Sequence, residues 1–463
     1  MDSQNKDGKT ILRELFQKEK EVGCFEYVIE GTSIYRFVRR SLITRLMKSS
    51  GIEVMKIKDA IDYKSAFKSV LVSVLQITKL LISGRKYDTV FLPFMRIDKV
   101  GGWYMDKFTD PLIELCFKDK EGYIIFDQGR AGVHARPRMH ENHCVQTDCL
   151  VAGSRYYSKL FWKSFYRKYK DTIDGLYDTI IQIDSNCGLT KTSIAKYVCS
   201  GLRYQRYFEI LFKRLKAKRV IGPTRRRAEF TAAHKLGMKA YECQHGISYG
   251  ETIMYGGFQP KEYTPDNFLA FGNNNPIDVY GIAPEKIVNI GWALNNIIAS
   301  SKDFIQYNTR DVLVISDPEI TDSIINFTLL LAKANPESHF YVRPHPHEKI
   351  SESQKNRLES LPNAHWQDKR INIAMVMQGF THVVGENSTV LYEALAVGKK
   401  VAKLYCEGLH PRYLREEDKD CFWEVRDEET FSRFLNEDIS TKKAKSIYSP
   451  FNKELFMQTI GIG

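Results

Sequence analysis

The stretch VVGENSTVLYEALAVGKKVAKL, residues 383–404, carries the pattern that decides the predicted fold. An apolar run is followed by a short polar turn, by apolar residues at helical spacing, and then by Gly398. A glycine in that place ends a helix, and a second apolar run follows it at once. Strand, helix and strand within so short a length predict one unit of an α/β sheet.

The same alternation runs through most of the 463 residues. Short apolar runs that predict strands cover residues 87–94, 122–127, 219–222, 239–244, 267–272, 311–316, 339–344, 381–386 and 399–405. A break falls at residues 287–310, where a strand-like piece leads into a polar, linker-like stretch. Because the chain is too long for one compact domain, two domains are expected, residues 1–292 and 293–463, with a last helix in 449–461 that can pack back on the first.

Composition narrows the classes of protein. The 68 Lys and Arg against 56 Asp and Glu give a net charge of +12, which suits a phosphorylated substrate, an anionic membrane surface or nucleic acid. No nucleic-acid-binding motif is present, so nucleic acid is not an expected partner. The nine cysteines form no CxxC pair, which argues against zinc-ribbon and thioredoxin-like sites and fits reduced thiols in a cytoplasm. The polar start predicts no signal peptide.

Two stretches combine apolar and basic residues. Lys68 and Lys79 interrupt residues 65–84, so no transmembrane helix is expected there. The stretch predicts a helix packed in the core with its lysines in solvent, and a helix lying on a membrane surface is the alternative. Residues 155–170, rich in aromatic and basic residues, predict a helix with an aromatic core face, with contact to anionic lipid as the alternative.

Candidate binding residues follow a predicted strand in HFYVRPHPHE, residues 339–348. Ligands of open α/β sheets bind at the carboxyl ends of the strands. Arg343 and His345 stand in such a place, in a loop that two prolines stiffen. A guanidinium and an imidazole N–H on a stiff loop suit phosphate oxygens, and a plain surface turn is the alternative.

The turn after residue 386 predicts a second anion site in the same domain. Asn387, Ser388 and Thr389 stand where a helix starts, so they can hold a phosphate or simply cap the helix. Glu393, just over one helical turn further, can accept a hydrogen bond from a ribose or serve packing. Because His345 and Ser388 follow strands of one sheet, their loops are expected to converge on one phosphate or diphosphate group.

Two strand ends in the N-terminal half carry candidate bases. KAYECQHGISYG, residues 239–250, ends a strand with Gln244 and His245, and YIIFDQGRAG, residues 123–132, ends another with Asp127. Histidine titrates naturally near neutrality, whereas an aspartate base needs only to be ionised and well placed. A core histidine is the alternative for His245, and the choice between the two bases stays open.

These motifs resemble a known family. RPHP, ENST and EALAVGKKV resemble the nucleotide-binding half of bacterial GT-B glycosyltransferases that build surface polysaccharides. The His-Pro and Ser-Thr pairs resemble those of bacterial sialyltransferases, Kdo transferases and the CDP-glycerol polymerases of teichoic acid synthesis. QHG resembles the loop of capsule-synthesis transferases, and DQG resembles the acidic motif of the sialyltransferases, with a glutamine at its second position. Residues 27–42 and 95–114 also look like the opening segments of polysaccharide-synthesis proteins, so the resemblance covers most of the chain.

The resemblance implies a GT-B fold, an α/β architecture in which an acceptor-binding and a donor-binding Rossmann-like domain face a central cleft. It implies that a sugar passes from a nucleotide-sugar to a growing or lipid-linked bacterial surface glycan, with no metal or other cofactor. The implied donor-binding residues are Arg343, His345, Asn387, Ser388, Thr389 and Glu393. The implied acceptor-binding residues are Arg96, Arg130 and Gln244.

The resemblance also ranks the donors. A CMP-sugar such as CMP-Kdo or CMP-sialic acid is expected ahead of a UDP-sugar or a CDP-polyol, because the similar families use cytidine nucleotides. A non-catalytic GT-B scaffold is the alternative from another class of function. A protein of this kind is expected in the cytoplasm, with peripheral contact to the anionic inner membrane as an option.

Overall fold

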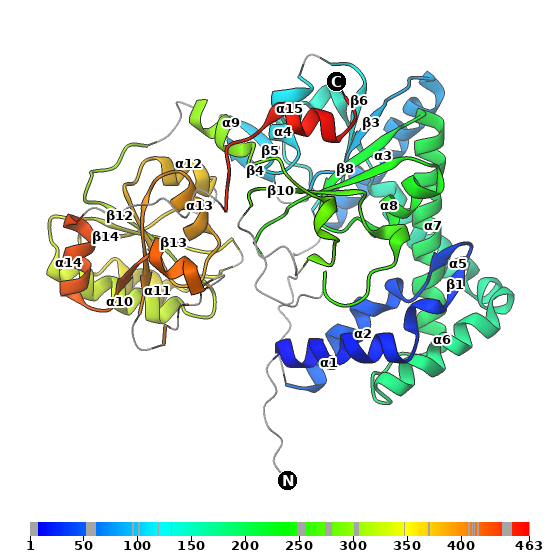
Figure 1. Ribbon diagram of the computed structural model, residues 1–463, viewed down its shortest axis with the longest axis horizontal. Coiled ribbons are helices and arrows are strands. Elements are labelled where there is room, and N and C mark those ends of the chain that lie inside the picture. Colours follow the sequence, from blue (N-terminus) through cyan, green and yellow to red (C-terminus); the bar gives the residue numbers. More distant parts are fainter. Residues whose placement is uncertain are drawn as a thin grey trace, which may run out of the picture.

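The computed structural model describes residues 8–51, 62–94, 97–100, 102–118, 120–130, 132–247, 255–273, 280–300, 305–346, 348–368, 371–405, 408–409, 411, 413, 416–437 and 447–462. Two parallel β-sheets surrounded by helices form the two halves of the molecule (Figure 1). The N-terminal sheet contains β3 (Thr89–Phe91), β6 (Tyr123–Asp127), β7 (Cys144–Gln146), β8 (Arg219–Pro223), β9 (Lys239–Cys243), β10 (Asn267–Ala270) and β11 (Ile287–Asn289). The C-terminal sheet contains β12 (Val312–Ile315), β13 (Phe340–Arg343), β14 (Ala364–Trp366), β15 (His382–Gly385), β16 (Lys400–Leu404) and β17 (Trp423–Val425).

Both sheets have the strand order of a Rossmann fold. The N-terminal order is β11-β10-β9-β8-β3-β6-β7, and the C-terminal order is β14-β13-β12-β15-β16-β17. In each sheet the chain starts at an interior strand, adds two strands on one side, and then crosses to the other side of the first strand. The predicted fold class, α/β with two Rossmann-like domains of the GT-B kind, is therefore confirmed.

Burial explains why these segments form strands. Every residue of β6 and of β12 is buried, and both segments read as continuous apolar runs up to their last residues. Parallel strands covered on both faces have this pattern, because neither side of the strand meets water.

All nine segments that the sequence predicts as strands contain one. The remaining strands of the two large sheets, β7, β11, β14 and β17, have three residues each and lie at the four edges of these sheets. Edge strands have only one neighbour and are partly exposed, so their apolar pattern is short, and of these four the sequence showed only β11, as the strand-like piece that begins at residue 287.

Helices flank the sheets. The N-terminal half holds α1 (Gly8–Glu21), α2 (Arg36–Ser49), α3 (Tyr63–Ser83), α4 (Asp110–Cys116), α5 (Asp148–Lys168), α6 (Lys170–Ile183), α7 (Lys191–Leu215) and α8 (Arg227–Lys235). Two small hairpins pair β1 (Val28–Ile29) with β2 (Thr32–Ser33) and β4 (Ile97–Val100) with β5 (Trp103–Asp106). The later helices are α9 (Leu294–Ser300), α10 (Thr321–Ala334), α11 (Glu352–Leu358), α12 (Ile373–Gln378), α13 (Val390–Ala396), α14 (Glu428–Asn436) and α15 (Lys453–Thr459). Short 3₁₀ helices cover Cys24–Glu26, Glu141–His143, Lys261–Tyr263, Pro284–Lys286 and Glu416–Cys421.

The end of the chain returns to the N-terminal half. The backbone N–H of Trp292 donates to Ser449 O over 2.9 Å, and the N–H of Ser449 donates to Phe271 O over 2.7 Å. Beyond this crossing, Phe456 of α15 and Ile460, which follows the helix, are buried in an apolar cluster of the N-terminal domain. The last segment therefore ties the two halves together.

The surroundings of α3 differ from the prediction of a core-packed helix with solvated lysines. The helix exposes large apolar side chains as well as lysines, and its buried face contains Ser69, Ser73, Ile77 and Leu80. The reason is the shape of that contact: small serines let the helix approach β7 and α5 closely along a narrow stripe, which leaves most of its apolar surface outside.

The crossing at Gly291 predicts a stability difference between two glycines. Gly291 (φ +77°) and Gly398 (φ +78°) are both left-handed, but a Cβ at Gly291 would lie 2.1 Å from Pro450 O, whereas nothing lies within 4 Å at Gly398. Gly398→Ala should cost about 1–2 kcal/mol of left-handed strain alone. Gly291→Ala should lower the melting temperature clearly further, and equal melting temperatures of the two variants in a thermal unfolding scan would contradict this packing.

Candidate active site

The carboxyl ends of β13, β12 and β15 lie next to one another in the C-terminal sheet. The chain goes from β12 to β13 on one side and returns as β15 on the other, so the switch point lies between β12 and β15. The Ser388 turn follows β15 and borders this point. The loop of His345 follows β13, roughly 10 Å away across β12, given the usual spacing of strands. The loop that starts at Ser316 lies between them.

A buried carboxylate holds the His345 loop. Oε1 of Glu348 accepts from Ser316 Oγ (2.8 Å) and from Thr321 Oγ1 (2.6 Å), and Oε2 accepts from the backbone N–H of His345 (2.7 Å). Glu348 is only 2% exposed. It therefore clamps the loop after β13 to the loop after β12. Sequence reasoning missed this role, although an acid three residues after a strand-end histidine was a visible signal.

Arg343 is placed differently from the expected phosphate ligand. Its side chain is buried, and its guanidinium donates to the backbone carbonyls of Asp368 and Ile371. These contacts hold the segment that leads into α12. Phosphate binding by Arg343 stays a prediction, and the contacts in the structure are those of a loop-holding residue.

The turn after β15 is also held by a buried residue of a neighbouring strand. Asn387, Ser388 and Thr389 are partly exposed, and Ser388 Oγ accepts from the backbone N–H of Val390 (3.3 Å), which is a capping contact. Nζ of Lys403, a fully buried residue of β16, donates to Glu386 O over 3.0 Å. Burial lowers the pKa of Lys403 to about 8. A lysine inside an otherwise apolar strand was the signal for this second support.

Glu393 joins the two halves of the molecule. Its carboxylate lies 3.6 Å from Nζ of Lys107, which precedes α4 in the N-terminal domain, and only 8% of the Glu393 side chain is exposed. The same ammonium group lies 5.2 Å from the centre of the Phe108 ring. The contact of Glu393 with a ribose stays a prediction. In the structure the neighbour of this carboxylate is the ammonium group of Lys107.

His245 lies between two aromatic rings. Its ring centre is 4.5 Å from that of Phe94 and 5.1 Å from that of Phe108, and the residue is partly exposed. Lys107 is the next residue to Phe108, so a continuous set of contacts runs from His245 through Phe108 and Lys107 to Glu393. The carboxyl end of β9 and the first turn of α13 are thereby brought together.

Asp106 places both rings. Its Oδ2 accepts from the backbone N–H of Phe94 (2.9 Å), and its Oδ1 accepts from the N–H of Phe108 (3.2 Å) and of Thr109 (2.7 Å). The backbone N–H of Asp106 in turn donates to Oδ2 of Asp110 (2.7 Å). Asp106 is fully buried. Sequence reasoning missed Asp106, although it lies within residues 95–114, one of the segments that carry the family resemblance.

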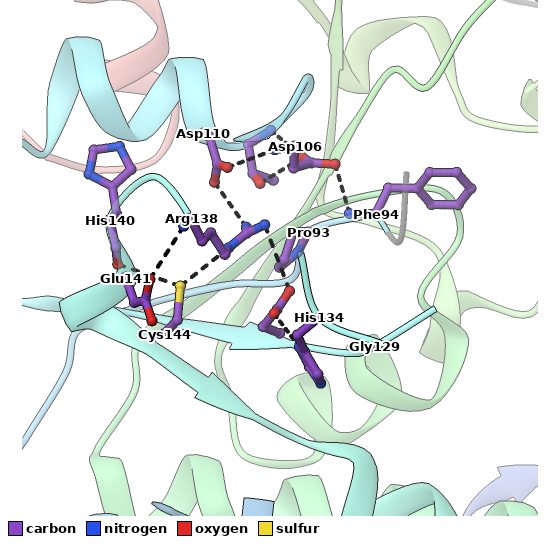
Figure 2. A network of polar contacts seen from close by, with 12 residues as sticks. Pro93, Phe94, Asp106, Asp110, Gly129, His134, Arg138, His140, Glu141 and Cys144 are labelled. Atoms are coloured by element: carbon purple, nitrogen blue, oxygen red, sulfur yellow. Dashed lines mark hydrogen bonds and ion pairs between the residues drawn. The ribbon is translucent and has the colours of Figure 1, made fainter. Parts of the chain in front are cut away.

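Asp127 belongs to the same buried network, which Figure 2 shows from close by. One oxygen of Asp127 lies 2.7 Å from His134 Nδ1, the other lies 3.8 Å from Arg138 Nη1, and Arg138 also contacts Asp110 (3.3 Å). His134 Nε2 lies 2.8 Å from Asp148. Asp127 is 1% exposed.

The electrostatics of this network follow from burial and pairing. Burial alone would raise the pKa of Asp127, but the hydrogen bond from His134 and the charge of Arg138 outweigh it and lower the pKa. Burial likewise opposes protonation of His134, yet Asp127 and Asp148 raise its pKa to about 9. Burial raises the pKa of Asp110 to about 7. A carboxylate that is buried and paired with a cation is a weak and inaccessible base.

The predicted acceptor-binding residues fall in three different places. Gln244 is fully buried: its Oε1 accepts from the N–H of Phe271 (2.7 Å) and its Nε2 donates to Gly246 O (3.1 Å), so it holds the loop of His245. Arg130 pairs by its backbone with Val133 in the loop after β6. Arg96 lies outside the described residues. Acceptor binding by these three stays a prediction.

Three consecutive arginines, residues 225–227, read from the sequence as a solvated helix start, with phosphate binding as the alternative. The structure differs from that reading. Arg225 Nε bonds to Glu242 Oε2 (2.7 Å), and both side chains are fully buried. Arg226 donates to Pro93 O (2.5 Å), which joins the ends of β8 and β3 at the switch point of the N-terminal sheet. Burial lowers the pKa of Arg227 to about 10. Arg225 is therefore an interior cation, whereas Arg226 and Arg227 are partly exposed.

Among the described residues, no group of three or more His, Cys, Asp or Glu side chains is placed to hold a metal ion. Catalysis without a metal ion stays a prediction, because a metal ion can also be held by the phosphates of a substrate.

Comparison with known proteins gives a likeness in chain path. No protein-family model matches this sequence, and no curated protein does either. Solved structures that are similar include UDP-GlcNAc 2-epimerase from Neisseria meningitidis bound to UDP-GlcNAc (TM-score 0.45, 12% identity, covering 80% of this chain and 99% of that one). Others are UDP-GlcNAc 2-epimerase from Methanocaldococcus jannaschii (0.43, 10%, 78% and 97%) and the glycosyltransferase SnogD from Streptomyces nogalater (0.39, 12%, 81% and 95%). At such identities and TM-scores, the likeness carries no argument about activity.

The Glu348 clamp predicts a large effect of one carboxylate. Glu348→Ala leaves two hydroxyls and the His345 N–H without their acceptor, so it should lower the stability of the C-terminal domain by about 3 kcal/mol. Glu352→Ala, which removes an exposed carboxylate that pairs with Lys355, is the matched control and should change little. Urea unfolding of both variants checks this, and equal midpoints would contradict the clamp.

The buried histidine predicts a pH dependence of stability. Because the pKa of His134 is raised to about 9 in the folded state, its contribution is full below the unfolded value of about 6.5 and is lost as pH rises to 9. The stability advantage of the natural protein over His134→Gln should therefore shrink by about 3 kcal/mol across that window. Denaturant unfolding at a series of pH values measures it, and a constant difference would show that His134 is neutral when folded.

Proposed function

We propose that this chain is a nucleotide-sugar-dependent glycosyltransferase, with the donor held on the C-terminal domain and the acceptor activated from the N-terminal domain. The observation that carries the proposal is the set of contacts from His245 through Phe108 and Lys107 to Glu393. It brings a histidine at a strand end of one Rossmann-like domain to the helix that follows the switch point of the other. Ligands of such sheets bind at that point.

The chemistry assigns a role to each side. The bond between the sugar's anomeric carbon and the donor phosphate oxygen breaks, and its electron pair leaves with the nucleotide. A new bond forms between that carbon and the acceptor oxygen, whose proton passes to His245. His345 and the hydroxyls of Ser388 and Thr389 are the groups proposed to hold the phosphate, whose negative charge grows as it leaves.

The contacts of the two candidate bases favour His245. Asp127 is 1% exposed and is paired with His134, and its pKa is lowered, so it suits a structural role. His245 is partly exposed, and its ring is fixed by Phe94 and Phe108, whose backbones are held by Asp106. Holding a base in one orientation lowers the entropic cost of reaction.

The finer statement of donor and acceptor rests on the sequence resemblance. We propose a cytidine nucleotide donor first, such as a CMP-linked acidic sugar, and a UDP-sugar second. The proposed acceptor is a growing or lipid-linked surface glycan. The net charge of +12 suits these anionic substrates without choosing among them.

His245→Ala tests the proposal. The variant should lose turnover by about 10²-fold or more, because a general base contributes 10²–10⁴-fold, while nucleotide binding persists. Turnover is measured as release of the nucleotide from a panel of CMP-, UDP- and CDP-linked donors. Thermal-shift titration with CMP, CDP, UDP and GDP measures binding, and the largest stabilisation should come from a cytidine nucleotide.

His365→Ala is the matched control, since His365 is a partly exposed histidine of the edge strand β14. It should keep both activity and binding. Full turnover in His245→Ala would refute the assignment of the base. If none of the four nucleotides stabilises the protein, the donor site is refuted. If UDP stabilises it most, the donor is a UDP-sugar, and the rest of the proposal stands.

A further inference from the structure

The outer face of α3 is apolar along its whole length. Six large side chains of this helix are between 45% and 81% exposed: Tyr63, Phe67, Leu71, Val74, Leu75 and Ile82. They recur three, four or seven residues apart, so they share one side of the helix. Soluble monomers rarely expose so long an apolar row, which marks a surface for a partner or a membrane.

The inner face of α3 is fixed to the domain. Ser69 Oγ lies 3.0 Å from His134 Nε2, Ser73 Oγ accepts from the N–H of Cys149 (2.8 Å), and Gln76 accepts from the N–H of Gln146 (2.7 Å). Among the described helices α3 alone has the length and composition to cross a membrane, with a mean hydropathy of 1.5 and 22% of that window buried. Because its inner face is bonded along the helix, α3 in this fold can lie on a bilayer but does not stand free to span it.

The charges on the same helix are all positive. Lys64, Lys68 and Lys79 are exposed, and the sequence of α3 contains no Asp or Glu. Helix α5, which packs against α3, adds exposed cations and exposed apolar groups: Arg155, Lys159, Lys163, Arg167, Lys168, Tyr156, Leu160 and Phe161. The one carboxylate of α5, Asp148, is bonded to His134 in the interior network.

We propose that α3, supported by α5, docks this protein on the surface of an anionic lipid bilayer. Apolar and aromatic side chains that enter the headgroup region, next to lysines that meet lipid phosphates, are the features that hold interfacial helices. A second copy of this chain fits the face less well, because three lysines would oppose three lysines with no carboxylate on α3 to neutralise them. Both helices lie on the side of the N-terminal domain turned away from the C-terminal domain, so docking leaves the latter in solution (Figure 1).

The proposal does not depend on glycosyl transfer, since none of these outward side chains belongs to the candidate active site. Co-sedimentation of the full chain with vesicles tests it directly. The natural protein should bind vesicles that contain phosphatidylglycerol much more tightly than vesicles of phosphatidylcholine alone, and added salt should weaken the binding.

Phe67→Ser combined with Leu71→Ser and Leu75→Ser should reduce the partition coefficient at least tenfold. Each of Lys64→Gln, Lys68→Gln and Lys79→Gln should reduce it about fivefold.

Matched controls come from α10 of the other domain. Leu330→Ser removes an apolar side chain that is 43% exposed, and Lys333→Gln removes an exposed lysine, so both should leave vesicle binding unchanged. Unchanged melting temperatures show that the variants fold. The proposal is overturned if the natural protein fails to bind the anionic vesicles, or if the α3 and α10 variants bind alike. A self-association that the triple α3 variant abolishes, without vesicle binding, would assign the face to a second copy instead.

Discussion

The carboxylate of Asp106 is the point on which the candidate active site depends. It is buried, and its two oxygens hold the backbone N–H groups of Phe94 and Phe108, the residues whose rings enclose His245. A buried carboxylate is costly unless it is fully hydrogen-bonded. The backbone N–H groups of Phe94, Phe108 and Thr109 and the hydroxyl of Thr109 meet this requirement. The backbone N–H of Asp106 donates to Asp110, and Arg138 extends the network from Asp110 to Asp127, which pairs with His134. Figure 2 shows Asp106, Asp110, Arg138 and His134 in this arrangement. Since each group depends on the next, loss of one member leaves an unpaired charge in the interior.

The same network explains how two domains can share one site. Lys107 stands between Asp106 and Phe108, so fixing that segment also directs its side chain to Glu393 of the C-terminal domain. This ion pair is long, at 3.6 Å. The chain itself makes a firmer connection where Ser449 of the returning C-terminal segment accepts from the backbone N–H of Trp292 and donates to Phe271 O. The two halves are therefore connected by the crossings of the chain and by an apolar cluster, and at the candidate site by the ion pair of Lys107 with Glu393.

The C-terminal domain prepares its loops in the same manner, with buried charges beneath them. Glu348 fixes the loop of His345, and Lys403 fixes the turn of Ser388, each through bonds to the loop's own backbone. Loops held in this way lose little entropy when a ligand binds. In both domains, then, the candidate site residues are supported by residues that themselves stay inside the protein.

The sequence by itself determined the elements that rest on local patterns. Continuous apolar runs located all interior strands, and a strand-helix-glycine-strand unit predicted the parallel sheet, because hydrophobic periodicity is a property of neighbouring residues. It also placed His245 at a strand end. Only the tertiary structure decided which charged residues face each other. Asp127 became a partner of His134, Arg225 became a buried partner of Glu242, and the apolar side of α3 was left facing outward. Such pairings join segments far apart in the chain, and their energies depend on burial, which no local pattern encodes.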